Sequence, residues 1–368
     1  MQTAILLHSL ELPTVDESKH YDVLIALGKI LNISETNNLT NPLVDKVYDC
    51  SGYIGLPGLV DAHIHILGGG GGDGYRSYVN GPNANDLLRV GITSLIASLG
   101  FDSTTRTLTE LVRKARTLAA AGLGVRCLIG GFYFPPLTIT GDIRQDYVLI
   151  PEVVGAGELA LGDSRASTLL DNELANYAGA CFTGSSLAGK PPILQIHLGD
   201  DPKVFSRLMH IAESAKLPLA MFHVTHVNRD EALLTAAAEF AKRGGMIDVT
   251  THLPKLVPGA EAVLRLLELG APDERITVST DAFGGMLVGK EYVPSPADVL
   301  LACLQELAGA GLPVAQAIKY VAGNAACYFG FPDRGAIAEG MWADILLLDK
   351  KTLSLEAVVA SGNMNTVG

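Results

Sequence analysis

The chain has 368 residues, of which 48% are hydrophobic and 18% are charged, and its formal net charge is −12. This composition indicates a folded protein with a large apolar core and excludes a disordered or fibrous chain. The acidic excess argues against nucleic acid or an anionic membrane as a partner, because both are bound mainly through basic residues. A small molecule or a peptide is the expected substrate.

The amino-terminal segment, residues 1–57, alternates short apolar runs such as AILLHSLEL and YDVLIAL with turn-forming polar residues. This pattern predicts a small antiparallel sheet without helices. The first residues lack the basic start and long apolar stretch of a signal peptide, and no uncharged run of membrane-spanning length follows. The five cysteines are odd in number and widely spaced, which favours reduced thiols over disulfides. We therefore expect a cytoplasmic protein.

Eight strand-like apolar runs follow, separated by segments with helical periodicity. The runs are 58–66, 91–98, 124–133, 155–162, 191–199, 217–226, 246–251 and 276–283. Intervening stretches such as 103–122 and 230–245 have apolar residues at three-to-four spacing and end in glycine, as amphipathic helices do. The alternation predicts an α/β fold, a (β/α)8 TIM-like barrel, with its active site at the carboxyl ends of the strands.

The carboxyl-terminal segment resembles the amino-terminal one in its pattern. Residues 335–349 and 355–362 are further short strand-like runs, so the two chain ends are expected to pair in one small β-sandwich domain. The predicted domains are therefore 1–57 (first part of the sandwich), 58–334 (barrel) and 335–368 (second part of the sandwich).

The first sign of chemistry is the pair His63 and His65 at the end of the first barrel run. Residues two apart on a strand share a face, so both imidazoles can point into one cavity. An isolated pair of this kind is about as often an ordinary feature of a half-buried strand as it is part of a metal site. The five glycines at 68–72 that follow are unusual in a packed element and indicate backbone close to a ligand, with Gly70 a candidate substrate contact.

The other predicted strand ends carry more metal-ligand residue types. They are Glu158, His197, His226 and Asp281. With the first pair they make four imidazoles and two carboxylates, a set that suits two divalent ions with an open position for water. Zinc is the expected metal, although these ligand types also accept manganese, cobalt or iron.

The chain resembles the amidohydrolase superfamily, and within it most closely the bacterial isoaspartyl (β-aspartyl) dipeptidases. The resemblance covers most of the chain and is carried by GLVDAHIHILGGGG, TITG at 138–141, QIHLGD, THVNR, STDAFG, and GNAACYFGF followed by GAIAEGMWADILLLD. It implies hydrolysis of the isopeptide bond that forms when aspartate is linked through its side chain. It also implies assembly into a homo-oligomer.

The resemblance also implies roles for single residues. His63 and His65 would hold the more buried metal, and His197 with His226 the more exposed one. A metal-bridging hydroxide would attack the substrate, with Asp281 as the catalytic general acid and base. Arg165 and Arg229 match the family's positions for binding a substrate carboxylate, which an arginine can hold bidentately.

One departure from the family concerns the ligand that bridges the metals, often a carboxylated lysine on strand four. The segment GAGELALGDSR has no lysine, and Glu158 is the available substitute. Its side chain is shorter, so its backbone must lie nearer the metals. One residue more than the family pattern between Gly155 and Asp163 predicts a strand irregularity that supplies this shift. We expect Glu158 to bridge the metals without dependence on carbon dioxide.

Other departures lie in the substrate pocket. The family's amine-binding glutamate is replaced by Gly72, and the adjacent Asp73 is the candidate substitute. Three further family positions read Phe101, Phe132 and Gly285 here. The family's pocket tyrosine aligns with Phe132, and the adjoining Tyr133 is the candidate that would polarise the substrate carbonyl.

These changes leave the substrate open. Alternatives within the superfamily are an N-acyl-D-amino-acid deacylase and a cyclic imide or ureide hydrolase, and a different class of alternative is a catalytically silent scaffold. Of the remaining polar residues, Asp61 is expected to brace a ligand or the barrel end. His223 and His252 are expected to form structural hydrogen bonds.

Overall fold

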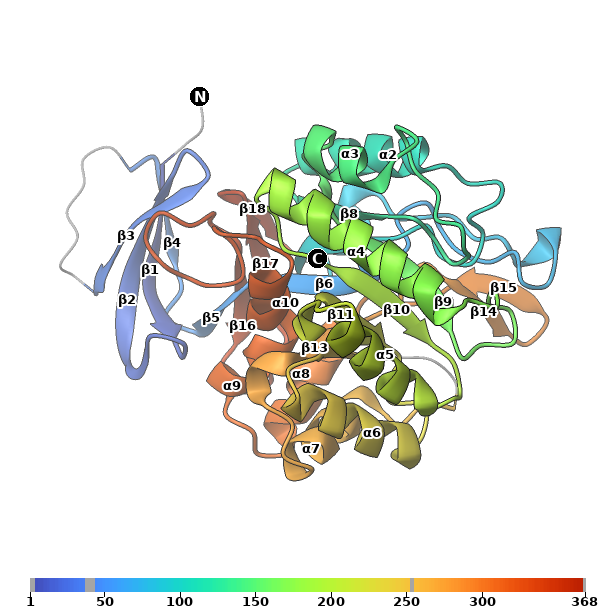
Figure 1. The fold of residues 1–368 in the computed structure, drawn as a ribbon. Helices are drawn as coiled ribbons and strands as arrows, with labels where there is room; N and C mark the ends of the chain where they lie inside the picture. Colours follow the sequence, from blue (N-terminus) through green and yellow to red (C-terminus); the bar gives the residue numbers. More distant parts are fainter. Residues whose placement is uncertain (1–3, 37–43, 252–254, 367–368) are drawn as a thin grey trace.

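The computed structural model describes residues 4–36, 44–251 and 255–366. It contains a barrel of eight parallel strands and a second eight-stranded sheet built from both chain ends (Figure 1). The predicted fold class, a TIM-like barrel with a smaller β domain, is confirmed.

The barrel strands occur in chain order around the sheet, each paired with its sequence neighbours. They are β6 (Leu59–Ile64), β7 (Ile92–Ala97), β8 (Gly124–Ile129), β9 (Val153–Leu161), β10 (Leu194–Leu198), β11 (Phe222–Thr225), β12 (Met246–Thr250) and β13 (Ile276–Ser279). The ring closes where the amide of Asp281 donates to the carbonyl of His63 and that of His65 donates to Ala282, both at 3.0 Å. The closure therefore lies at the predicted site.

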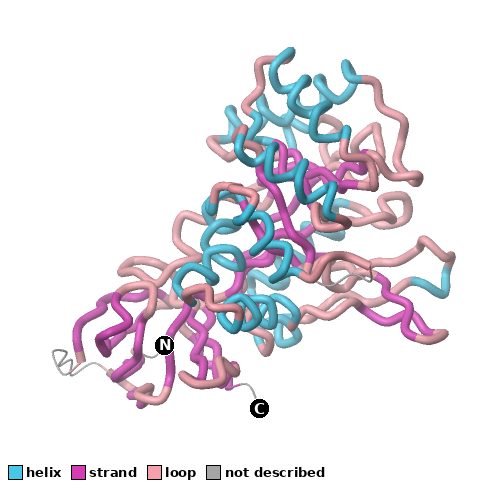
Figure 2. Tube along the Cα trace, turned by 90° about the horizontal axis from the view of Figure 1, so that it is seen from below, coloured by secondary structure: helices cyan, strands magenta, loops and turns pink. Residues whose placement is uncertain are grey.

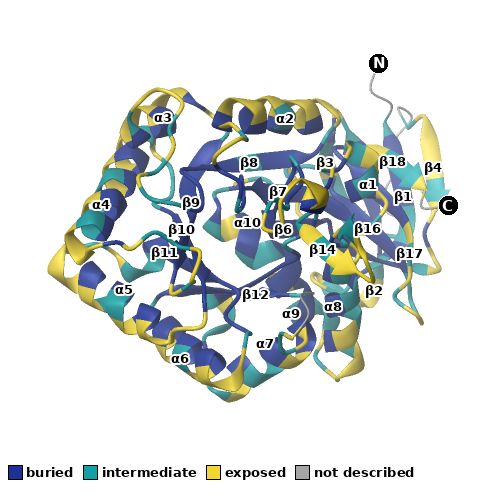
Figure 3. Cartoon of the chain, turned by 90° about the vertical axis from the view of Figure 1, so that its right-hand side faces the viewer, coloured by how far each residue is buried: buried dark blue, intermediate teal, exposed yellow. Residues whose placement is uncertain are grey.

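Helices cover the outside of the barrel, with their buried faces turned inward and their exposed faces turned outward (Figure 3). They are α1 (Ala84–Leu88), α2 (Leu108–Ala120), α3 (Ile143–Leu149), α4 (Asp171–Ala188), α5 (Lys203–Ser214), α6 (Glu231–Lys242), α7 (Gly259–Glu268), α8 (Val299–Gly309), α9 (Val314–Ile318) and α10 (Asn324–Tyr328). Short turns of other helical types are η1 (Tyr75–Ser77), η2 (Leu219–Met221), η3 (Asp273–Arg275) and η4 (Lys319–Gly323). The start of α2 shows the local cause: Thr107 and Glu110 form a reciprocal capping box, and Leu111 and Leu118 then face the core.

The terminal sheet has the strand order β18-β17-β16-β5-β1-β2-β3, with β4 beside β1. Its strands are β1 (Ile5–Leu12), β2 (Asp16–Ala26), β3 (Lys29–Glu35), β4 (Lys46–Asp49), β5 (Tyr53–Pro57), β16 (Ile345–Asp349), β17 (Leu355–Ala360) and β18 (Asn363–Thr366). They gather on one side of the helices (Figure 2). β5 pairs with β16, so the two ends share one sheet as expected, although β4 and β5 pair parallel to β1 instead of antiparallel. The boundaries at 57/58 and 334/335 remain predictions.

One further element was not expected from the sequence. The antiparallel hairpin β14 (Gly285–Val288) and β15 (Glu291–Pro294) follows the last barrel strand.

All five cysteines are free, and four of them are buried. Among the described residues, no helix has the length and apolar character needed to cross a membrane.

Candidate metal centre and active site

The six predicted ligands come together at the carboxyl ends of the barrel strands. His63 and His65 extend from β6, Glu158 is on β9, His197 is on β10, and His226 and Asp281 follow β11 and β13. Glu158 and all four histidines are buried, and Asp281 is nearly so. His63 and His65 therefore point into the same site, as the alternation of side chains along a strand predicts.

Glu158 occupies the middle of this group, and its two oxygens face different histidines. Its Oε1 lies 3.5 Å from His63 Nε2 and 3.9 Å from His65 Nε2. Its Oε2 lies 2.8 Å from His197 Nδ1 and 3.8 Å from His226 Nε2. A carboxylate in this position can place one oxygen toward each of two cations.

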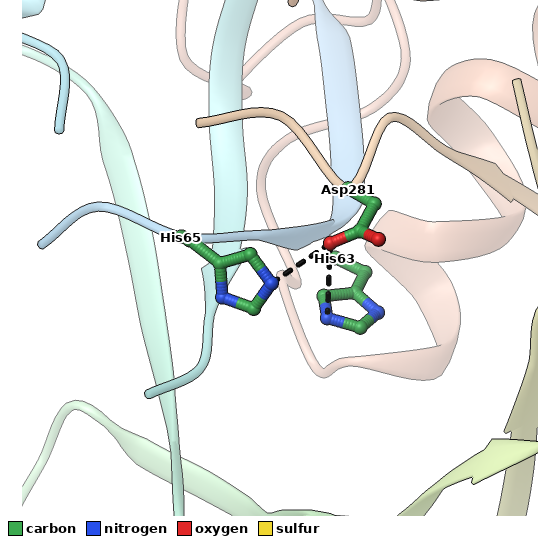
Figure 4. A group of neighbouring side chains, drawn as sticks. All are labelled: His63, His65 and Asp281. Carbon is green, nitrogen blue, oxygen red and sulfur yellow. Dashed lines mark ion pairs between the residues drawn. The ribbon is translucent and has the colours of Figure 1, made fainter. Parts of the chain in front are cut away.

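Asp281 lies on the side of the first histidine pair (Figure 4). Its Oδ1 is 2.8 Å from His65 Nε2 and 3.9 Å from His63 Nε2. The potential ligand atoms of these three residues lie within 4.8 Å of one another, as do those of His63, Glu158 and His226. The described residues thus offer two overlapping sets of metal ligands that share His63.

The chemistry of the donors fits divalent cations. The Nε2 atom of His63 is buried and has no hydrogen-bond partner among the described residues. Burial lowers the pKa of His63, but the carboxylates of Glu158 and Asp281 outweigh it and raise this pKa to about 10. The carboxylates therefore stabilise positive charge at a nitrogen that is otherwise unpartnered, which is the electrostatic condition that favours a cation at this point.

Neighbouring hydroxyl groups orient the imidazoles. The Nδ1 atom of His226 lies 2.7 Å from Thr250 Oγ1, and that of His63 lies 3.4 Å from Thr225 Oγ1. Thr225 in turn donates to the buried carboxylate of Asp248 at 2.8 Å. These contacts hold the Nδ1 atoms and leave both Nε2 atoms directed at the centre, as ligand-orienting partners do.

The strand irregularity that was predicted near Glu158 is present. β9 advances by three residues, from Ala156 to Leu159, where β10 advances by two, from Leu194 to Ile196. This bulge contains Gly157, which has a φ of 127°, a conformation that favours glycine. There is also no room for a side chain here, because a Cβ atom on Gly157 would lie 2.5 Å from the carbonyl oxygen of Gln195. The bulge carries Glu158 into the centre.

Two of the grouped residues have left-handed backbone conformations. His226 has a φ of 65° and Asp281 a φ of 53°. This conformation costs a non-glycine residue about 1–2 kcal/mol. Such local strain persists where surrounding structure fixes it and is concentrated at functional sites.

A cavity of about 290 Å³ opens above the group. Four of the five predicted substrate-binding residues line it, namely Gly70, Asp73, Arg165 and Arg229. Among the described lining residues Phe132 is present and Tyr133 is not. The ring of Phe132 is 4.9 Å from that of His197, and Tyr133 packs at 5.3 Å against Phe132. A contact between Tyr133 and the substrate therefore remains a prediction, and the residues that line the cavity do not support it.

The two arginines are held in fixed orientations. Arg165 forms a bidentate pair with Asp163, at 2.9 and 2.8 Å, and its guanidinium lies 5.3 Å from the ring centres of Phe101 and Phe132. Asp163, which sequence reasoning missed, also lies 3.5 Å from His197 Nε2. Its position two residues after the end of β9, the strand that carries Glu158, was the available signal.

The remaining arginine is anchored on the neighbouring strand. Arg229 donates through Nε to the carbonyl of Leu198 at 2.7 Å, and its Nη2 lies 3.3 Å from His197 Nε2. The guanidinium is thereby placed at the edge of the centre, on the cavity wall. Both arginines are thus in position to meet an anionic group beside the ligands.

The rim of the cavity consists of the glycine run and the hairpin. Asp73 accepts a hydrogen bond from the hydroxyl of Tyr292, on β15. Gly285 packs against the glycine run so closely that a Cβ atom there would lie 2.8 Å from Ser77 O and 3.1 Å from Gly70 Cα. The close packing explains the glycine at this position. Tyr292 was missed because the hairpin was not predicted.

The other polar residues have structural partners. Asp61 accepts hydrogen bonds from the amides of His63 and Thr280, which braces the ends of β6 and β13 as expected. His223 is buried between Gln195 and Thr277, in agreement with a structural role. His252 lies outside the described residues.

Comparison with known proteins places this geometry in a family. The structure of a β-aspartyl dipeptidase from Fervidobacterium islandicum AW-1, in complex with β-Asp-Leu dipeptide, matches with a TM-score of 0.91 and 30% identity, covering 98% of this chain and 96% of that chain. This chain belongs to the β-aspartyl dipeptidase family. Membership identifies it as a metal-dependent hydrolase of the amidohydrolase superfamily, and the presence of all six ligand types argues against the silent scaffold.

Other comparisons are more distant. A dihydropyrimidinase from Brevibacillus agri NCHU1002 shares the fold, with 16% identity, a TM-score of 0.69 and coverage of 99% of this chain and 95% of that chain. The adenine deaminase of Methanoculleus marisnigri is 24% identical over 320 residues, which are 83% of this chain. The chain spans 52% of the length of that relative. No family model matches the sequence.

Proposed function

We propose that this protein hydrolyses the isopeptide bond of β-aspartyl dipeptides, using two divalent metal ions, with zinc the expected metal. The proposed ligands are His63, His65, Glu158, His197, His226 and Asp281. The observation that carries the proposal is the position of Glu158, with one oxygen toward each pair of histidines. The bound ions would acidify a water molecule and polarise the scissile carbonyl.

Asp281 is the proposed general base and general acid. Both of its ion pairs with histidines use Oδ1, and the residue lines the cavity, so Oδ2 remains for a substrate or solvent proton. The carboxylate takes a proton from the attacking water and delivers it to the leaving amine. Burial raises the pKa of Asp281, but the adjacent His65 and His63 outweigh this, hold the pKa below its usual value and keep the carboxyl ionised before the proton transfer.

The cavity walls supply recognition of a small zwitterion. Arg165 and Arg229 offer guanidinium groups to the substrate's carboxylates, and Asp73 on the opposite rim offers a carboxylate to its free ammonium group. A volume of about 290 Å³ suits a ligand of dipeptide size. We also propose that the protein acts in the cytoplasm as a homo-oligomer.

The test is hydrolysis of β-aspartyl-leucine by zinc-loaded protein, followed by chromatography of free aspartate and leucine. Release of both, with α-aspartyl-leucine left intact, is the expected result. Parallel reactions with N-acetyl-D-leucine and dihydrouracil cover the deacylase and the cyclic ureide hydrolase. Turnover of either compound without turnover of β-aspartyl-leucine would overturn the proposed substrate.

A further inference from the structure

A second cavity, of about 680 Å³, lies at the opposite end of the barrel, where β9 and β10 begin. Its walls are formed by residues around these strand starts and by the segment 330–336, which leads from α10 back toward the terminal sheet. The lining is largely apolar and includes Val154, Pro191 and Phe331. Of the described lining residues, three are basic and none is acidic. The basic residues are Arg126, Lys190 and Arg334.

Two of these cations already have partners. Lys190 donates to the carbonyl oxygens of Tyr147, Ile150 and Val153 at 2.7–2.8 Å. Arg334 forms a buried ion pair with Asp344. They fix the shape of the cavity and have little capacity left for a ligand.

Arg126 differs, because the carboxylates near it are bound elsewhere. Asp333 pairs with Lys29 at 2.7 Å, and Glu152 pairs with Arg116 at 2.7 Å. Arg126 forms no ion pair with the described part of the chain, and its buried Nε has no hydrogen-bond partner there. Its guanidinium lies 4.9 Å from the ring centre of Phe331.

The buried Nε donor of Arg126 is costly to leave without a partner. A buried donor without a hydrogen bond is destabilising, and such groups in native proteins call for a water molecule or an ion. Burial also lowers the pKa of Arg126, in accordance with the unfavourable placement of its charge. In a chain of net charge −12, a cavity with an excess of positive charge is a local exception.

We propose that this cavity is a second ligand site, separate from the metal centre, which binds a small organic carboxylate through Arg126. The planar fork of the guanidinium would hold the carboxylate bidentately, and the apolar body of the ligand would lie against Phe331 and the neighbouring prolines. Such a ligand would contact both the barrel and the segment 330–336, so binding stabilises the connection between the barrel and the terminal sheet.

The chain contains its own reporter for this site. Cys327 lines the cavity and is exposed, whereas the other four cysteines are buried. The rate at which a thiol reagent labels the native, metal-loaded protein therefore reports on Cys327. The probe is benzoate, and benzamide is the uncharged control of the same shape.

At roughly 10 mM benzoate, enough to saturate a site with a dissociation constant near 1 mM, we expect labelling to slow about fivefold. Benzamide should leave the rate unchanged. Arg126→Gln should abolish the protection, whereas Arg265→Gln, which removes an exposed charge on α7, should retain it. A melting curve of each variant shows that it is folded.

Three outcomes would overturn the proposal. They are equal protection by benzamide, undiminished protection in Arg126→Gln, and no protection in either the parent or the Arg265→Gln protein. An effect of inorganic phosphate equal to that of benzoate would also contradict it, because that result assigns a general anion site without recognition of the apolar body. None of these results depends on the proposed dipeptidase activity.

Discussion

The floor and the rim of the active-site cavity are built differently. On the floor, His63, Glu158 and His226 are at most 2% exposed, and each contacts a residue from another barrel strand. On the rim, Asp73 is exposed and its carboxylate accepts a hydrogen bond from Tyr292, which lies on a hairpin outside the barrel. The floor has all six residues proposed as metal ligands and departs from the family only in the bridging position, where Glu158 replaces the lysine, while the rim departs from the family pattern at several positions. We therefore expect reaction type and substrate preference to depend on separate parts of the molecule.

The largest expected effect tests the floor. Glu158→Gln removes the negative charge between the two histidine pairs, so we expect kcat on β-aspartyl-leucine to fall by about 10³-fold, together with bound metal. Elemental analysis and steady-state kinetics measure both. Glu152→Gln, at an acid paired with Arg116 at the start of β9, is the control. Full activity with two metals per chain in Glu158→Gln would show that this carboxylate does not bridge them.

The next largest effect on activity is expected at Arg165, on the cavity wall between the floor and the rim. Arg165→Lys keeps the charge but loses the planar fork that pairs with Asp163 and the stacking on Phe101 and Phe132. We expect kcat/KM to fall about 100-fold. Arg207→Lys, at an arginine on α5 outside the cavity, should have no effect. An unchanged kcat/KM in Arg165→Lys would remove this arginine from the binding site.

The rim itself should influence binding more than turnover. Asp73→Asn and Tyr292→Phe each remove one side of the contact across the cavity mouth, and we expect KM to rise about tenfold with kcat nearly unchanged. The double variant should be no worse than Asp73→Asn alone, because both changes disrupt one interaction. Additive effects on log KM would mean that Tyr292 does not act through Asp73.

The smallest effect concerns stability. Gly285→Ser would place a Cβ atom against Ser77 and Gly70, so we expect the free energy of unfolding to decrease by about 1–3 kcal/mol. Gly72→Ser is the matched control, since a Cβ atom at Gly72 meets no atom within 4 Å. Thermal melting distinguishes the two. An equal melting temperature for both variants would contradict the close packing of the rim.

The sequence predicted the floor better than the rim for a physical reason. A parallel barrel brings all strand ends to one mouth, so recognising His197 or Asp281 as a strand-end residue was enough to place it there. The bulge at Gly157 was also predictable, because the segment between Gly155 and Asp163 has one residue more than the family pattern. By contrast, adjacent residues of a strand point to opposite faces, and an uncertainty of one position exchanges Tyr133 for Phe132. The contacts of Asp163 and Tyr292 depend on how loops fold over the barrel, which no periodicity encodes.

The place of β5 in the terminal sheet has a consequence for biosynthesis. β5 lies between β1 and β16, and the single residue Gly58 connects it to the first barrel strand. A nascent chain that extends only to residue 340 contains every barrel strand, yet β5 still has one unpaired edge. Translation of the residues that follow then supplies β16, β17 and β18. An incomplete product therefore leaves the second edge of β5 open to chaperones and proteases, and this edge is covered once β16 pairs with it.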